Sequence, residues 1–179
     1  MTIWNIDALD VCRLQGEDKK LTDLIDSLIM SALGKVMLKG DRNQLFYIFK
    51  FTTLFESIKT SIATDWTNAN GVEAARRLAR HLPSPYLDGE GLPVVPELTR
   101  RVLSDFESDE RTFQEFCAGT HSLELMVGDI AGQYDQYANV ASKFLAHPLR
   151  RIREWAQYEI KSANSRAQSW RDHEEDRDD

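Results

Sequence analysis

Cysteine is scarce in this 179-residue chain, which contains only Cys12 and Cys117, 105 positions apart. Neither belongs to a Cys-x-x-Cys pair, so the sequence excludes a disulfide framework and a zinc knuckle. We expect two buried thiols in a reducing compartment, which favours the cytoplasm. The four histidines are scattered, and no His-Glu-x-x-His pattern occurs. The sequence therefore predicts no metal site and no cofactor.

Long apolar runs and phosphate-binding loops are also lacking. No run approaches the ~18 residues that span a bilayer, and the N-terminus MTIWNIDALD has no signal-peptide pattern. Neither GxxxxGK[ST] nor GxGxxG occurs. The GTHS stretch at 119–122 lacks the GxSxG form of a nucleophile turn and is typical of a helix stop followed by a cap. These absences predict a protein that is not an enzyme.

The chain lacks an excess of basic residues. It has 22 Lys and Arg against 29 Asp and Glu, a net charge of −7 with a pI near 5.2. Six of those acids and two arginines fall in residues 171–179, so the rest of the chain is close to neutral. A near-neutral body disfavours both a DNA mimic and a general nucleic-acid binder. The acidic tail, 171–179, is typical of a frayed helix end in solvent, the alternative being a tether for a basic partner.

Proline and glycine are few, and they gather in one place. Four of the five prolines and two of the nine glycines lie in residues 83–96. This segment is the only clear break in the chain, so we expect an irregular functional loop or a surface crossover there. We predict a single helical domain over residues 1–170, with a possible subdivision at 83–96.

Apolar residues recur at steps of three and four along most of the chain, which is the period of amphipathic helices. No stretch shows the alternation of a strand, so the sequence predicts an all-α fold of antiparallel helix hairpins. Glycines are expected to end a helix at 119 and to interrupt one at 128 and 132. Trp66 and Trp155 are predicted core residues, and Trp4 and Trp170 candidate interface anchors. The expected helices cover residues 18–39, 42–66, 67–82, 97–106, 108–119, 121–146 and 148–170.

The segment 146–160, AHPLRRIREWAQYEI, resembles the second helix of a HEAT repeat. The matching positions are Pro148, Ile152, Arg153, Ala156 and Ile160. The resemblance implies that Ile152, Ala156 and Ile160 pack on one face. It also implies a short HEAT-like α-solenoid, and helix pairs recur near residues 20, 70 and 121, close to the 40–47-residue period of such repeats. An irregular helical bundle is the alternative.

The C-terminal part of the chain, from FCAGTHSLELMVGD through AQSWRDHEED, is similar to C-terminal helical modules of bacterial antiviral-defence proteins. That similarity implies a role in assembly or target sensing. Three functions are left open by the sequence. They are a non-catalytic interaction subunit or adaptor of a bacterial multi-protein assembly in antiphage defence, an immunity or antitoxin-like protein that masks a toxin, and a nucleic-acid-binding helical module.

Arginine clusters are the candidate contacts with a protein partner or, less favoured, with nucleic acid. Stacked helices could align them in one groove. The alternative is a solvated face in which Glu73, Glu97 and Glu154 are the ion-pair partners. The candidate partner-binding residues are Arg76, Arg77, Arg80, Arg100, Arg101, Arg150 and Arg151.

Overall fold

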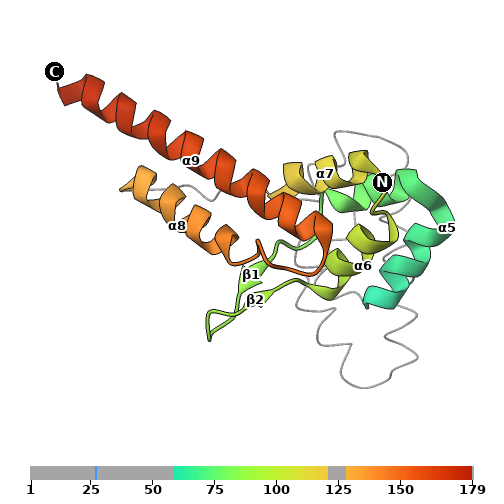
Figure 1. Cartoon of the computed structure of the whole chain (residues 1–179). Helices are drawn as coiled ribbons and strands as arrows, with labels where there is room; N and C mark the ends of the chain where they lie inside the picture. Colours follow the sequence, from blue (N-terminus) through green and yellow to red (C-terminus); the bar gives the residue numbers. More distant parts are fainter. Residues whose placement is uncertain (1–26, 28–58, 121–127, 179) are drawn as a thin grey trace, which may run out of the picture. The chain divides into compact units, whose positions relative to one another are not determined.

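The computed structural model describes residue 27, residues 59–120 and residues 128–178 (Figure 1). These residues are mostly helical, as predicted, with one small two-stranded sheet. They divide into two compact units. The first unit contains residues 59–83 and 97–119, and the second contains residues 84–96 and 120–178. The helices expected at 18–39 and over most of 42–66, with Trp4 and Cys12, lie outside the described residues.

Helix α5 (Thr60–Ala79) opens the first unit, and it is kinked at Gly71. Gly71 has φ 74° and ψ −164°, a conformation that only glycine adopts readily. The Asn70 side-chain amide donates to the Trp66 carbonyl at 2.8 Å. The sequence predicts a new helix from 67 with Asn68 or Asn70 as its N-cap; the structure differs, because α5 continues through 67 and bends at Gly71.

Helices α6 (Glu97–Asp105) and α7 (Glu110–Thr120) also contribute buried residues to the described part of the first unit. The sequence offers Ser108 or Asp109 as the N-cap of this helix, and the structure shows Asp109 in that role, since its carboxylate accepts the Thr112 backbone N–H at 2.8 Å. The sequence predicts five inward residues for the helix at 67–82, and all of them are buried except Val72: Val72, Ala75, Leu78, Ala79 and Leu82. Trp66, a predicted core residue, is only half-buried. The largest buried apolar residues of the unit are Leu78, Leu82, Leu98, Val102, Leu103 and Phe116.

Gly119 lies inside α7 and does not end it, which corrects the sequence prediction. A Cβ atom at this position would lie 2.1 Å from the Arg80 carbonyl oxygen. The glycine is required because the end of α5 passes directly against the α7 backbone. Close backbone approach, and not helix termination, explains its place in the sequence.

The segment expected to be irregular, 83–96, contains a hairpin of strands β1 (Tyr86–Leu87) and β2 (Pro93–Val94). The strands are antiparallel, with Tyr86 opposite Val94 and Leu87 opposite Pro93. The Asp88 carboxylate closes the turn by accepting the backbone N–H groups of Glu90 and Leu92, both at 2.9 Å. The hairpin is too short to show strand periodicity, so the sequence pattern did not reveal it.

Helix α8 (Ile130–Ser142) begins the main part of the second unit. The N-cap Asp129 accepts the Gly132 backbone N–H at 2.8 Å, and a Cβ atom at Gly132 would lie 2.2 Å from this carboxylate. Gly132 therefore belongs to the first turn and is no interruption, in contrast to the prediction. Gly128, with φ 91°, lies just before the helix. Residues 121–127 of the helix expected at 121–146 lie outside the described residues.

Helix α9 (Arg150–Asp178) runs antiparallel to α8 and continues past it (Figure 1). The seam between them is built largely of small side chains, with Tyr134 and Ala138 on α8 facing Ala163 and Ala167 on α9. At the other end of the pair, the Phe144 and Trp155 rings meet edge to face at 5.5 Å, which confirms Trp155 as core. The helix extends to Asp178, so most of the acidic tail is helical, and residues 171–174 are exposed.

The buried stripe of α9 differs from the predicted one at its third position. Ile152 and Ala156 are fully buried as expected, whereas Ile160 is only half-buried and Glu159 is 1 % exposed. Eight residues turn a helix by 80° beyond two full turns, whereas seven fall 20° short of them. The stripe from Ile152 therefore returns at Glu159, so the expectation of a packed Ile160 is wrong. Leu145, also expected inward, is 42 % exposed.

Candidate functional site

Arg76 of the first unit binds Asp109 with two parallel hydrogen bonds. Its Nε and Nη2 atoms lie 3.0 and 2.7 Å from the two carboxylate oxygens. The Arg76 guanidinium holds the pKa of Asp109 well below its usual value, and the Thr112 hydrogen bonds act in the same direction against partial burial. This pair links α5 to the N-terminus of α7, so Arg76 is engaged in holding the fold together.

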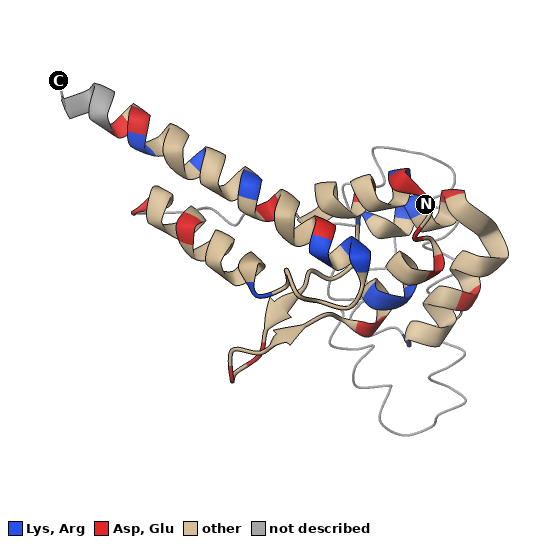
Figure 2. Cartoon of the chain, viewed as in Figure 1, with Lys and Arg blue, Asp and Glu red and all other residues tan. Residues whose placement is uncertain are grey.

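The other candidate arginines of the first unit also have acidic partners. Arg77 lies 3.0 Å from Glu73, and Arg80 lies 3.5 Å from Glu115. On α6, Arg100 and Arg101 share Glu97, and the hydrogen bonds from Arg100 and then Arg101 lower the pKa of that carboxyl. Figure 2 shows basic and acidic residues next to one another on these helices.

Arg150 and Arg151 of the second unit share the carboxylate of Glu154, each at 2.8 Å. The Arg151 side chain is only 6 % exposed, so the expectation of an exposed arginine at this position is wrong. Arg150, at 48 % exposed, remains on the surface.

The ion-pair partners predicted for a solvated face, Glu73, Glu97 and Glu154, are thus confirmed. Of the seven candidate arginines, five belong to the first unit and two to the second. Their role as partner contacts stays a prediction.

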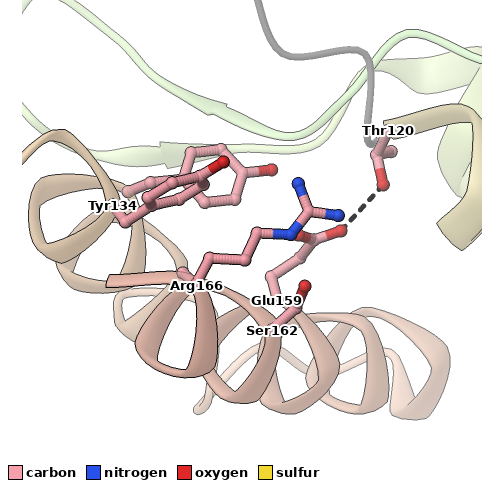
Figure 3. Close-up of a pocket in the computed structure, with 7 residues that line it drawn as sticks. Thr120, Tyr134, Glu159, Ser162 and Arg166 are labelled. Carbon is pink, nitrogen blue, oxygen red and sulfur yellow. Dashed lines mark hydrogen bonds between the residues drawn. The ribbon is translucent and has the colours of Figure 1, made fainter. Parts of the chain in front are cut away.

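A small pocket opens between α8 and α9 in the second unit (Figure 3). Four of its lining residues come from α9 at positions i, i+3, i+4 and i+7, which share one helix face. The remaining space is about 10 Å³, room for a single water molecule. The lining residues are Thr120, Tyr134, Tyr137, Glu159, Ser162, Ala163 and Arg166.

Glu159 is the buried acid of this pocket. Its Oε1 accepts a hydrogen bond from the Thr120 hydroxyl at 2.8 Å, and that hydroxyl accepts the Trp155 indole N–H at 3.2 Å. A chain of hydrogen bonds therefore joins the core tryptophan to the carboxylate, which offsets part of the cost of burying it.

Arg166 is the basic group of the pocket. Its guanidinium carbon lies 5.9 Å from the centre of the Tyr134 ring, within the range of a cation–π contact. Figure 3 shows the Arg166 and Glu159 side chains both extending from α9, on the pocket that they line. The sequence analysis missed both residues, although an acid at i+7 from Ile152 on an apolar stripe was a usable signal.

Two described histidines have lowered pKa values. Burial lowers the pKa of His81, and the neighbouring Arg80 adds to the effect. Burial also lowers the pKa of His147, with a smaller contribution from Arg153. The His147 ring nitrogen Nδ1 accepts the Leu149 backbone N–H at 3.2 Å, so its neutral form caps the turn into α9. Both are structural groups.

Within residues 59–120 and 128–178, no group of three or more potential ligands is placed to hold a metal ion. Over the same part of the chain, no helix is both long and apolar enough to cross a membrane. The Cys117 side chain is buried and forms no disulfide bond. His121 and Ser122 of the GTHS stretch lie outside the described residues. Comparison with models of protein families, with curated proteins and with solved structures yields no match to this chain.

Proposed function

We propose that this protein is a non-catalytic interaction subunit or adaptor of a bacterial multi-protein assembly, and that its second unit carries the partner surface. Exposed apolar side chains on that unit are the observation that supports the proposal. Of the six large hydrophobic side chains exposed in the described residues, five belong to the second unit. These five are Tyr86, Leu92, Leu145, Tyr158 and Trp170.

Tyrosine and tryptophan are the side chains that most often anchor protein interfaces, because each buries a large rigid surface at low entropic cost. Trp170 continues the buried stripe of α9, three residues beyond Ala167, yet it is 38 % exposed. Its ring makes one edge contact with His173. Arg171, next to Trp170, pairs with Asp135 in the second turn of α8. The buried stripe of α9 therefore ends near the N-terminus of α8. A partner helix or strand could complete it.

The ion pairs of the seven candidate arginines support a protein partner over nucleic acid. Each of them has a carboxylate within 4 Å, and a phosphate would have to displace that acid. A HEAT-like arrangement built on the antiparallel α8–α9 pair is part of the proposal. A role in antiphage defence is also part of it.

The test is to co-express the tagged full-length chain with the products of neighbouring genes, purify the complex and measure its affinity by calorimetry. Tyr158→Ser and Trp170→Ser alter exposed side chains, so circular dichroism and the melting temperature should stay unchanged. We expect the double variant to weaken binding at least tenfold. Ser165→Ala, an exposed change on the same helix, is the matched control. Unaltered affinity of the double variant would exclude this surface.

A further inference from the structure

We propose that Asn70 is a site of spontaneous covalent modification, at which the backbone nitrogen of Gly71 attacks the Asn70 side chain and converts it to aspartate and isoaspartate. The kink of α5 at Gly71 is what permits this reaction inside a helix. The reactants are the chain itself and water, so the reaction needs no enzyme and no cofactor. The proposal holds whether or not the chain is an adaptor.

Ring closure is the first step of the reaction. The Gly71 amide nitrogen loses its proton to a base in the solvent, and its electron pair forms a bond to the Asn70 Cγ. The bond from Cγ to Nδ2 then breaks, and the leaving nitrogen takes up a proton from water and departs as ammonia. The product is a succinimide ring that joins the side chain of Asn70 to the backbone of Gly71.

Ring opening by water is the second step. Water adds to one of the two ring carbonyls, and the bond from that carbonyl to the ring nitrogen breaks. Attack at the side-chain carbonyl gives aspartate, and attack at the backbone carbonyl gives isoaspartate, in which the main chain runs through the former side chain. The two steps together consume one water and release one ammonia, and no atom is oxidised or reduced.

The Asn70 side chain meets the first requirement, because it is exposed and in contact with solvent. Its Nδ2 atom donates a hydrogen bond to the Trp66 carbonyl at 2.8 Å, and this bond must open before the ring can close. A single exposed hydrogen bond between neutral groups contributes little net free energy. Its opening therefore slows the reaction by about tenfold at most.

Gly71 meets the second requirement, which is an attacking nitrogen without steric hindrance. The residue has no side chain, and a Cβ atom built there would meet nothing within 4 Å. Neighbouring elements therefore leave the attacking side open. A nucleophile held next to its target in the same chain also reacts far faster than one that must arrive from solution.

The kink removes the obstacle that a regular helix presents. In a continuous helix the dihedral angles are fixed and each backbone N–H is held in the hydrogen-bond ladder, so the nitrogen is not free to approach the preceding side chain. In α5 the helical geometry is interrupted directly after Asn70, since Gly71 has φ 74° and ψ −164°. Residues at such a break open more readily than residues inside a continuous ladder.

Two other exposed asparagines in helices provide the internal comparison. Asn68 precedes Ala69 in the same helix, and Asn164 precedes Ser165 inside α9. Neither of them precedes a glycine. Modification is therefore expected to concentrate at Asn70.

The products change both the charge and the backbone of α5. Either product adds one negative charge at the kink, and isoaspartate also adds one carbon to the main chain there. The part of α5 beyond the kink carries Arg76, which pairs with Asp109 of the α7 cap. The modified chain should therefore be separable from the unmodified chain by ion exchange.

The first experiment incubates the full-length chain near neutral pH in water labelled with heavy oxygen, followed by digestion with trypsin. Mass spectrometry of the peptide 60–76 detects the exchange of an amide for a labelled carboxyl group, and electron-transfer fragmentation locates it and identifies isoaspartate. We expect Asn70 to react at least tenfold faster than Asn68. The rate should rise with pH above neutrality, because the attacking nitrogen must lose its proton. Equal rates at the two asparagines, or no reaction at Asn70, would overturn the proposal.

The second experiment tests the kink by repeating the measurement on the chain unfolded in guanidinium chloride. Folding should slow the reaction at Asn70 by about tenfold at most, the cost of opening its hydrogen bond. Folding should slow the reaction at Asn164 much more, because α9 holds its backbone in place. If folding slows both sites equally, the kink does not open Asn70 to reaction and the proposal fails.

Variants complete the test. Gly71→Ala places a methyl group beside the attacking nitrogen and should slow the reaction at least tenfold, whereas Gly89→Ala, at an open position elsewhere, should leave it unchanged. Because alanine is strained at a positive φ, Asn70→Gln is the second variant. It keeps the amide donor, but its longer side chain would have to close a larger and less favoured ring. Uptake of label in the peptide 60–76 should disappear while the melting temperature stays unchanged, and uptake that persists would assign the reaction to another residue.

Discussion

Different interactions stabilise the interior of each unit. In the first unit, leucine, valine and phenylalanine side chains pack together, and the partly buried Arg76–Asp109 ion pair links α5 to α7. The second unit packs an alanine-rich seam between two long helices and encloses a carboxylate, Glu159, in it. In the first unit, the ion pairs Arg76–Asp109 and Arg80–Glu115 connect α5 with α7. Among the described residues, the second unit contains the buried Glu159 and the exposed aromatic side chains Tyr86, Tyr158 and Trp170, so we expect recognition there.

The largest expected effect is a loss of stability in the second unit alone. Ile152→Asp places an unpaired charge at a fully buried position, which should lower the free energy of unfolding by several kcal/mol. Ile160→Asp, at a half-buried position on the same helix, should cost much less. Hydrogen exchange measured by peptide should accelerate more in residues 130–174 than in residues 60–119. Equal losses for the two variants would show that the stripe of α9 is assigned wrongly.

A smaller effect is expected from the first unit. Gly119→Ala places a methyl group against the Arg80 carbonyl, so the helices must separate, at a cost of about 1–3 kcal/mol. The matched control is Gly89→Ala, since a Cβ atom there meets nothing within 4 Å. Thermal unfolding gives the difference between the two, and a neutral Gly119→Ala would contradict the close approach of α5 and α7.

The acid response sharpens the comparison further. Because the folded-state pKa of Asp109 lies below its unfolded value, its stabilisation is present above the unfolded pKa, near 4, and is lost as pH falls through the folded pKa. Asp109→Asn should remove that part of the acid loss, and it should also lower stability at neutral pH because the Arg76 guanidinium loses its charged partner, while asparagine can still cap α7. Melting temperatures between pH 7 and pH 2 measure this. Asp105→Asn is the control, and an acid response equal to that of the unaltered chain would count against the Arg76 link.

The smallest effect compares one histidine from each unit. Since burial lowers the pKa of both His81 and His147, the unfolded chain binds protons first as pH falls. Stability is therefore complete above pH ~6.5 and declines as pH falls from there toward the folded pKa values. NMR titration should place both midpoints below 6.5. A midpoint above 6.5 for either histidine would show that its ring is more exposed than described.

The sequence by itself determined the helical character of the described residues, a helix cap at Ser108 or Asp109, the inward leucines Leu98 and Leu103 of α6 and the acidic partners of the arginines. All of these follow from periodicity or from spacing within one helix, which local sequence specifies. Tertiary structure alone decided the rest. Position 119 requires glycine because the Arg80 carbonyl lies against it. Arg151 and Glu159 are buried, which the residue pattern of α9 alone does not predict. The Tyr134 ring of α8 contacts the Arg166 guanidinium of α9. Packing between segments distant in the chain fixes these contacts, and a helical period cannot encode which helix will lie opposite.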